Sequence, residues 1–267
     1  MRTANPTLGV FNRPQTWDDA RGISDRAKVM TLGGTIFAST VLIGITATVA
    51  TTAWSMLQDG NTVSSAVMPA LWGSLIGGLV LALIIVFKPK AAPFLSPVYA
   101  AVQGVFVGAI SLVVARMLDA RMEDAGIGLT TVFQAITLTF GIFAAMLIGY
   151  ASGILKFGQV VKNCIMAATG GIMIFYMAAI LLSFVGFTGM SGMLSFNNGS
   201  PISIGFSLFV VVIASLNLVL DFEFIEKGVQ AKAPKYLEWY GAFALLVTLV
   251  WLYIEILRLL SKLRGRH

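Results

Sequence analysis

Charged residues are scarce in this sequence, and cysteine and histidine each occur once. Charged residues make up 11% of the chain, whereas soluble domains carry roughly 25%. The single Cys164 excludes an internal disulfide and a CxxC metal or redox site. The single histidine is His267, at the very end of the sequence. These absences exclude a zinc site, Ser-His-Asp hydrolysis and a histidine proton relay, so we expect neither an enzyme nor a bound cofactor.

Long hydrophobic runs dominate what is present. Hydrophobic residues make up 57% of the chain, and the mean hydropathy is +0.87. Seven runs reach or approach the roughly 20 apolar residues that a membrane-spanning helix needs, and they cover 29–57, 69–87, 95–118, 131–155, 163–187, 201–225 and 236–260. The connections are too short for a catalytic domain outside the membrane. We therefore predict an all-α membrane protein, with an N-terminal segment over 1–28 and a seven-helix transmembrane domain over 29–267.

Lysine and arginine are distributed unevenly between the two ends of this predicted bundle. They are frequent before the first helix and in connections 2–3, 4–5 and 6–7, and absent from connections 1–2 and 5–6. The positive-inside rule then predicts a cytoplasmic N-terminus and places 191–200 outside a cell inner membrane. The C-terminal end disagrees, because it carries Arg258, Lys262, Arg264 and Arg266. Either the last helix does not cross fully or the earlier helices dominate, and we favour the second. The net charge of +6 thus indicates orientation and not nucleic-acid binding.

Asp221 is the residue that most needs an explanation. It follows the apolar run 207–220, and Glu223 and Glu226 come soon after it. An ionised carboxylate in a membrane-spanning helix costs at least about 2.5 kcal/mol. Such a group must find a cation or bind a proton, so it marks an ion path or a proton switch. The alternative is a carboxylate near the helix end, reached by water and paired with Lys227 or Lys232.

The partner of Asp221 follows from the geometry of a helical hairpin, in which residues equally far from the turn lie at equal depth. A turn near 231–234 brings Asp221 level with 241–247, next to Thr248. Glu255 lies too far along the last helix for a direct pair with Asp221. Glu255 and Arg258 are three residues apart on one helix, so we expect them to pair locally. Other polar residues within the spans are expected to bond neighbouring helices, and these are Gln103, Gln134, Tyr176 and Asn217.

The same hairpin carries a family resemblance. The segments SLNLVLDFEFIEKG at 215–228, EWYGAFAL at 238–245 and LRLL at 257–260 resemble the last two helices of the Bax inhibitor-1 family. The segment that begins PVYA, over 97–111, resembles the third-helix motif of that family. The resemblance extends over all seven predicted spans. It implies a seven-helix bundle with the last helix at its centre.

The resemblance also implies a function. Some bacterial members of the family are pH-sensitive calcium leaks that are gated by two aspartates, one on the sixth helix and one on the seventh. Asp221 matches the first aspartate, whereas Thr248 stands at the position of the second. Two carboxylates that share a proton titrate as a coupled pair, and one carboxylate facing a hydroxyl cannot. Glu223 and Glu255 are candidates for the missing second carboxylate.

We therefore expect a leak for calcium or another cation, controlled by protonation around Asp221, which could also ligate Ca²⁺. Asn217, Thr248, Glu223 and Glu255 are the residues expected to accompany it. The alternative is a non-conducting regulatory protein that binds membrane proteases or other membrane proteins, a role also attributed to bacterial relatives. A proton-coupled solute transporter is less favoured, because no inverted repeat or pair of broken helices is seen in the sequence.

Overall fold

Seven long helices form the molecule in the computed structural model, which describes residues 29–265 apart from 61, 124–125, 185–191 and 193–194. All seven are long and apolar enough to cross a membrane. The predicted N-terminal segment, 1–28, lies outside the described residues. In chain order the elements are α2 (Leu32–Leu57), β1 (Gln58–Asp59), β2 (Thr62–Val63), α3 (Val67–Phe87), the 3₁₀ turn η3 (Pro89–Ala91), α4 (Ala92–Met122), α5 (Ile127–Ala151), α6 (Gln159–Phe184), α8 (Pro201–Gln230) and α9 (Leu237–Arg264). The predicted all-α, seven-helix fold is confirmed.

Several helix ends differ from those predicted by hydropathy. Helices α4, α8 and α9 continue into polar sequence, and α8 reaches Gln230 instead of 225. Polar residues at the end of a span can stay helical because the helix satisfies their backbone groups, so the apolar run is shorter than the helix. Helix α5 stops early at Ala151, where Gly153 turns the chain with φ of +81°.

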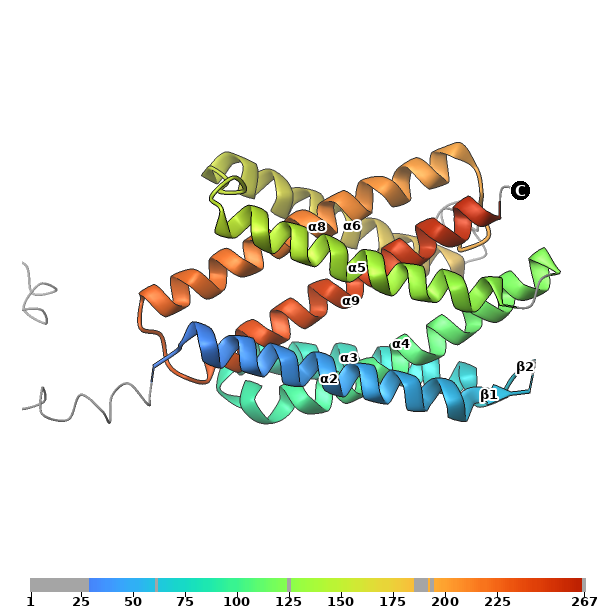
Figure 1. The fold of residues 1–267 in the computed structure, drawn as a ribbon, viewed down its shortest axis with the longest axis horizontal. Coiled ribbons are helices and arrows are strands. Elements are labelled where there is room, and N and C mark those ends of the chain that lie inside the picture. The colour runs from blue at the N-terminus through green and yellow to red at the C-terminus, as the bar shows by residue number, and fades with distance from the viewer. Residues whose placement is uncertain (1–28, 61, 124–125, 185–191, 193–194, 266–267) are drawn as a thin grey trace, which may run out of the picture.

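Helix α9 runs obliquely through the centre of the bundle (Figure 1), between α2, α3 and α4 on one side and α5, α6 and α8 on the other. It contacts α2, α4, α5 and α8. It is also the most buried of the spans among the described residues. Its 28 residues correspond to a length of about 42 Å, which exceeds a hydrocarbon core of about 30 Å. The last helix is therefore long enough to cross fully.

Two apolar clusters hold α9 in place. One joins it to α4, α5 and α8 through side chains that include Leu218, Phe222 and Leu252. The other joins it to α2 and α4, with Leu42 and Phe243 among its members. Away from these clusters, large apolar side chains face outward along α2, α3, α5 and α6, as expected for a surface in contact with lipid, and they include Phe37, Leu79, Phe133 and Ile174.

Helices α2 and α4 approach closely because small residues line their contact. A Cβ atom added at Gly108 would overlap the backbone of Ala50, and one added at Gly104 would overlap Val49. The Thr46 hydroxyl donates across the same contact to the carbonyl oxygen of Ala100 at 3.1 Å. Small residues at helix contacts in membranes allow this close packing. The packed pair of α2 and α4 forms one of the surfaces that α9 contacts.

Candidate functional site, a polar seam between α6, α8 and α9

Polar side chains line the contact between α6, α8 and α9 at helical spacing. Along α9 they recur at spacings of seven, three and four residues, which keeps them on one face of the helix, and the matching positions of α6 and α8 face them. Helix α8 runs antiparallel to α6 and α9, so the contacts form successive levels through the bundle. We call this set the polar seam, and it consists of Lys162, Thr169, Tyr176, Ser207, Asn217, Asp221, Glu223, Thr248, Glu255, Arg258 and Lys262.

Asp221 occupies the seam without a charged partner. Its Oδ2 atom is buried and has no hydrogen-bond partner among the described residues. The Thr248 side chain interacts with the Asp221 carboxyl group, and the Thr248 hydroxyl also lies 3.2 Å from the carbonyl oxygen of Ala244, one turn earlier. A hydroxyl has one hydrogen to donate. The structure thus brings Asp221 and Thr248 together, and within the described residues it leaves Oδ2 of Asp221 without a hydrogen bond.

The pairing of Asp221 with a lysine near the helix end is not what the structure shows. Lys227 lies 2.7 Å from Glu223, and Lys162 of α6 also pairs with Glu223. In the described part of the chain, neither Lys227 nor Lys232 forms an ion pair with Asp221. Successive residues of a helix are rotated by about 100°. Glu223 therefore faces α6 and its lysine, while Asp221 remains against α9.

Glu226 and Asn217, the other polar residues near Asp221 on α8, also form their hydrogen bonds with residues other than Asp221. Glu226 accepts hydrogen bonds from the hydroxyl of Tyr150 on α5 and from the side chain of Gln230. The Asn217 amide donates to the hydroxyl of Thr169 on α6 at 2.7 Å and to the carbonyl oxygen of Ile213 at 2.8 Å. Asn217 thus ties α8 to α6, and the structure does not direct its amide to Asp221.

Glu255 and Arg258 form a buried ion pair farther along the seam. The Arg258 Nη1 atom lies 2.8 Å and 2.7 Å from the two carboxylate oxygens of Glu255, and Glu255 is only 1% exposed. The Tyr176 hydroxyl of α6 donates to Glu255 at 2.7 Å, and the guanidinium also packs over the rings of Tyr176 and Phe196. The predicted local pair is confirmed. In the described structure Glu255 is paired with Arg258, and Glu223 is paired with Lys162 and Lys227, so both candidates for a second carboxylate are bound to cations instead of sharing a proton with Asp221.

Lys262 is a seam residue that the sequence did not reveal. Its side chain is fully buried, and its Nζ atom donates to the Ser207 hydroxyl at 2.8 Å and to the carbonyl oxygen of Ser203 at 3.3 Å. The sequence did contain a signal for it. Lys262 lies four residues after Arg258 and seven after Glu255, on the same face of α9, and serines occur at the end of α8 that faces it. With Lys262 and Arg258 set against one Glu255, this half of the seam carries excess positive charge, whereas the half with Asp221 does not.

Removal of one member of the buried Glu255–Arg258 pair should be strongly destabilising. We expect Glu255→Ala to lower the free energy of unfolding by about 3–5 kcal/mol, because it leaves the Arg258 charge buried without its partner. Glu223→Ala should cost less, about 1 kcal/mol, because the side chains of Glu223 and Lys162 remain 18% and 17% exposed and that of Lys227 is 68% exposed, so water can still reach the lysines. Unfolding by SDS in mixed micelles measures both. The double variant Glu255→Ala/Arg258→Ala should recover part of the loss, and equal losses for Glu223→Ala and Glu255→Ala would contradict this reading.

A resident metal ion finds little support in the described residues. No group of three or more His, Cys, Asp or Glu side chains comes together among them to hold one. Calcium prefers six to eight oxygen ligands, and the surroundings of Asp221 offer its own carboxylate and the Thr248 hydroxyl.

The comparisons with known proteins agree with this architecture. A family model described as Bax inhibitor 1 like matches residues 6–265. No curated protein and no solved structure matches the chain. The matched region includes every described helix, the α8–α9 hairpin and all residues of the polar seam. The chain therefore belongs to the Bax inhibitor 1 like family of membrane proteins.

Proposed function

We propose that the protein is a pH-sensitive leak for calcium or another cation, and that ionisation of Asp221 opens it. The observation that carries this proposal is the buried Oδ2 atom of Asp221, which has neither a cation nor a hydrogen-bond donor in the described part of the structure. An ionised carboxylate in that position would be poorly stabilised. A proton, water or an incoming cation would satisfy it.

The hydroxyl of Thr248 suits a protonated Asp221. While the Thr248 hydroxyl donates to the carbonyl oxygen of Ala244, its oxygen can accept the proton of a neutral Asp221 carboxyl group. In this arrangement both groups are satisfied and α8 and α9 stay together. When Asp221 loses its proton, Thr248 can offer only one hydrogen to a full negative charge, and the closed contact is weakened.

A second buried polar atom lies on the same face of α9, one turn from Thr248. Trp251 packs against apolar residues of α6 and α8, and its Nε1 atom has no hydrogen-bond partner within the described ranges. Water that entered this part of the seam would thus find an acceptor at Asp221 and a donor at Trp251. The Glu255–Arg258 pair and Lys262 then form the remaining barrier, which must rearrange before a cation can pass.

The experiment is a calcium-flux titration of the purified protein in liposomes that contain a calcium-sensitive dye. The proposal expects flux to be low in acid and to rise with pH, because the charged form of Asp221 is the open one. A protein that passes no calcium at any pH would contradict the leak. That result would favour the alternative of a non-conducting regulatory protein that binds membrane proteases or other membrane proteins.

We also propose that the N-terminus is cytoplasmic and that the protein resides in the cell inner membrane. The basic residues near the C-terminus opposed this orientation, and three of them, Arg258, Lys262 and Arg264, bond to residues of the protein itself. Arg264 donates to Gln134 at 2.9 Å, Arg258 is paired with Glu255, and Lys262 is buried. At the other end, Lys156 and Lys232 are exposed, and these positive charges favour the cytoplasmic side.

Cysteine labelling tests this orientation. In a Cys164→Ala background, a cysteine at Asn197, which is exposed in the α6–α8 connection, should react with an impermeant reagent in intact cells. A cysteine at Lys156, exposed at the opposite end, should react only after the membrane is permeabilised. The reverse pattern would overturn the proposed orientation.

A further inference from the structure

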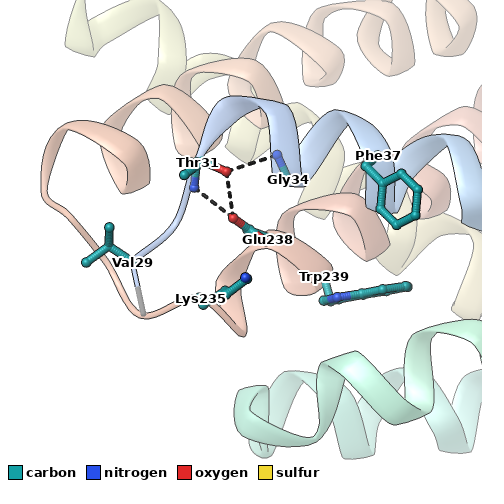
Figure 2. A pocket seen from close by; sticks show the side chains of 7 residues that line it. All are labelled: Val29, Thr31, Gly34, Phe37, Lys235, Glu238 and Trp239. Atoms are coloured by element: carbon teal, nitrogen blue, oxygen red, sulfur yellow. Dashed lines mark hydrogen bonds between the residues drawn. The ribbon is translucent and has the colours of Figure 1, made fainter. Parts of the chain in front are cut away.

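A pocket opens at the end of the bundle where α2 and α9 begin (Figure 2). Its volume is about 320 Å³, at the small end of the range for ligand sites, and none of its residues belongs to the polar seam. Its lining consists of Val29, Thr31, Gly34, Phe37, Lys235, Glu238 and Trp239. The chain is fixed beside it, because the Met30 amide donates to the carbonyl oxygen of Ala233 at 2.7 Å.

Glu238 is held rigidly in this pocket. Its side chain is 4% exposed, and its Oε1 atom accepts hydrogen bonds from the Thr31 amide at 2.9 Å and the Thr31 hydroxyl at 2.8 Å. The Thr31 hydroxyl oxygen in turn accepts from the Gly34 amide and caps α2, as Figure 2 shows. A Cβ atom at Gly34 would overlap the Glu238 carboxylate. One carboxylate oxygen is thus committed to the helix cap, while Oε2 has no donor among the described residues.

Lys235 contributes a separate positive charge to the same pocket. It lies three residues before Glu238 and lines the cavity with it. Within the described structure it forms no ion pair with Glu238 and no side-chain hydrogen bond. The pocket therefore contains one negative and one positive group that form no ion pair with each other. A ligand with both charges would complement both groups, whereas an anion would face Glu238 and a simple cation would face Lys235.

The apolar part of the pocket points to a lipid. Phe37 is 65% exposed on the outer surface of α2, where acyl chains would contact it. Trp239 lies at the start of α9, and tryptophan is enriched at the membrane–water interface. A charged pair of sites beside an exposed aromatic ring, at the end of two membrane-spanning helices, matches the change from headgroup to hydrocarbon in a phospholipid.

We propose that this pocket binds the headgroup of a zwitterionic phospholipid that carries a primary amine, the phosphoethanolamine class. Its ammonium group donates to Oε2 of Glu238, its phosphate binds Lys235, and its acyl chains run along Phe37 and Trp239. The N–H groups of the amine match a carboxylate acceptor, whereas a quaternary amine has no hydrogen to donate. The site is independent of ion conduction.

Native mass spectrometry of the purified protein tests the proposal with three probe lipids of identical acyl chains: phosphatidylethanolamine, phosphatidylcholine and phosphatidylglycerol. The parent should retain phosphatidylethanolamine about tenfold more strongly than either of the others, the effect of one charge-assisted hydrogen bond. Glu238→Gln keeps an acceptor oxygen for Thr31 and removes the charge, so it should abolish this preference. Lys235→Gln should weaken phosphatidylethanolamine binding by a similar factor.

Lys232→Gln is the matched control, because Lys232 lies in the same loop and does not line the pocket. It should retain the lipid preference of the parent. Lys235→Gln keeps the test decisive if Glu238→Gln fails to fold, since the Lys235 side chain is outside the hydrogen-bonded cap of α2. Equal retention of the three lipids by the parent, stronger retention of phosphatidylglycerol, or unchanged binding in Lys235→Gln would each overturn the proposal.

Discussion

Asp221→Asn is expected to abolish the pH response of calcium flux and to hold the flux at the low level that the parent shows in acid. Asparagine has the size and neutral charge of a protonated aspartic acid, and it cannot ionise. The side chain can still donate to the Thr248 hydroxyl oxygen, so the contact between α8 and α9 should persist. Flux titrations of the parent and the variant in liposomes of the same composition measure the effect.

Two control variants separate this effect from a general loss of negative charge. Asp59→Asn makes the same chemical change at an exposed position in β1. Glu226→Gln changes a carboxylate on α8 that is bonded to Tyr150 and Gln230. Both variants should show the same dependence of calcium flux on pH as the parent. If either control changes the flux as much as Asp221→Asn does, or if Asp221→Asn titrates like the parent, Asp221 is not the gate.

Thr248→Asp is expected to shift the rise of calcium flux to higher pH. It places a second carboxylate beside Asp221 and restores the pair of aspartates that the family resemblance implies. Two carboxylates this close share one proton, because repulsion between two negative charges opposes the loss of the second proton. Full ionisation of the pair therefore needs a higher pH than ionisation of Asp221 alone, and the midpoint of flux against pH measures this shift.

Thr248→Asn is the matched control, because it has a similar shape to the aspartate and cannot ionise. An unchanged midpoint in Thr248→Asp, or the same shift in Thr248→Asn, would contradict the paired-carboxylate reading. Glu223→Gln and Glu255→Gln should not move the midpoint, since these carboxylates are bound to Lys162, Lys227 and Arg258. A shifted midpoint in either variant would make that residue the second carboxylate after all.

Helical geometry and hydropathy predicted the seven helices and the main contacts of the α8–α9 hairpin. Seven apolar runs predicted the seven helices, because only helices satisfy the backbone of such runs in lipid. The antiparallel arrangement of α8 and α9 was enough to place Asp221 near Thr248, and the spacing of three residues was enough to pair Glu255 with Arg258. These inferences need only helical geometry and a short turn.

Contacts between helices that are distant in sequence could not be predicted from helical geometry and hydropathy. Thr31 and Glu238 are 207 residues apart, and their bond depends on how α2 packs beside α9. Tyr176 reaches Glu255 only because α6 lies against α8 at a particular rotation. Lys227 was an alternative partner for Asp221, but the rotation of α8 places it against Glu223. Hydropathy does not encode these rotations, which follow from side-chain packing across the whole bundle.

Infrared difference spectroscopy of the reconstituted protein during a pH titration can show directly whether Asp221 ionises as the leak opens. The carbonyl stretch of a protonated carboxylic acid is distinct from the bands of an ionised carboxylate, and Asp221→Asn identifies which band belongs to Asp221. We expect the Asp221 acid band to disappear over the same pH range in which calcium flux rises in matched liposomes. Flux that rises while the Asp221 band stays unchanged would contradict this expectation.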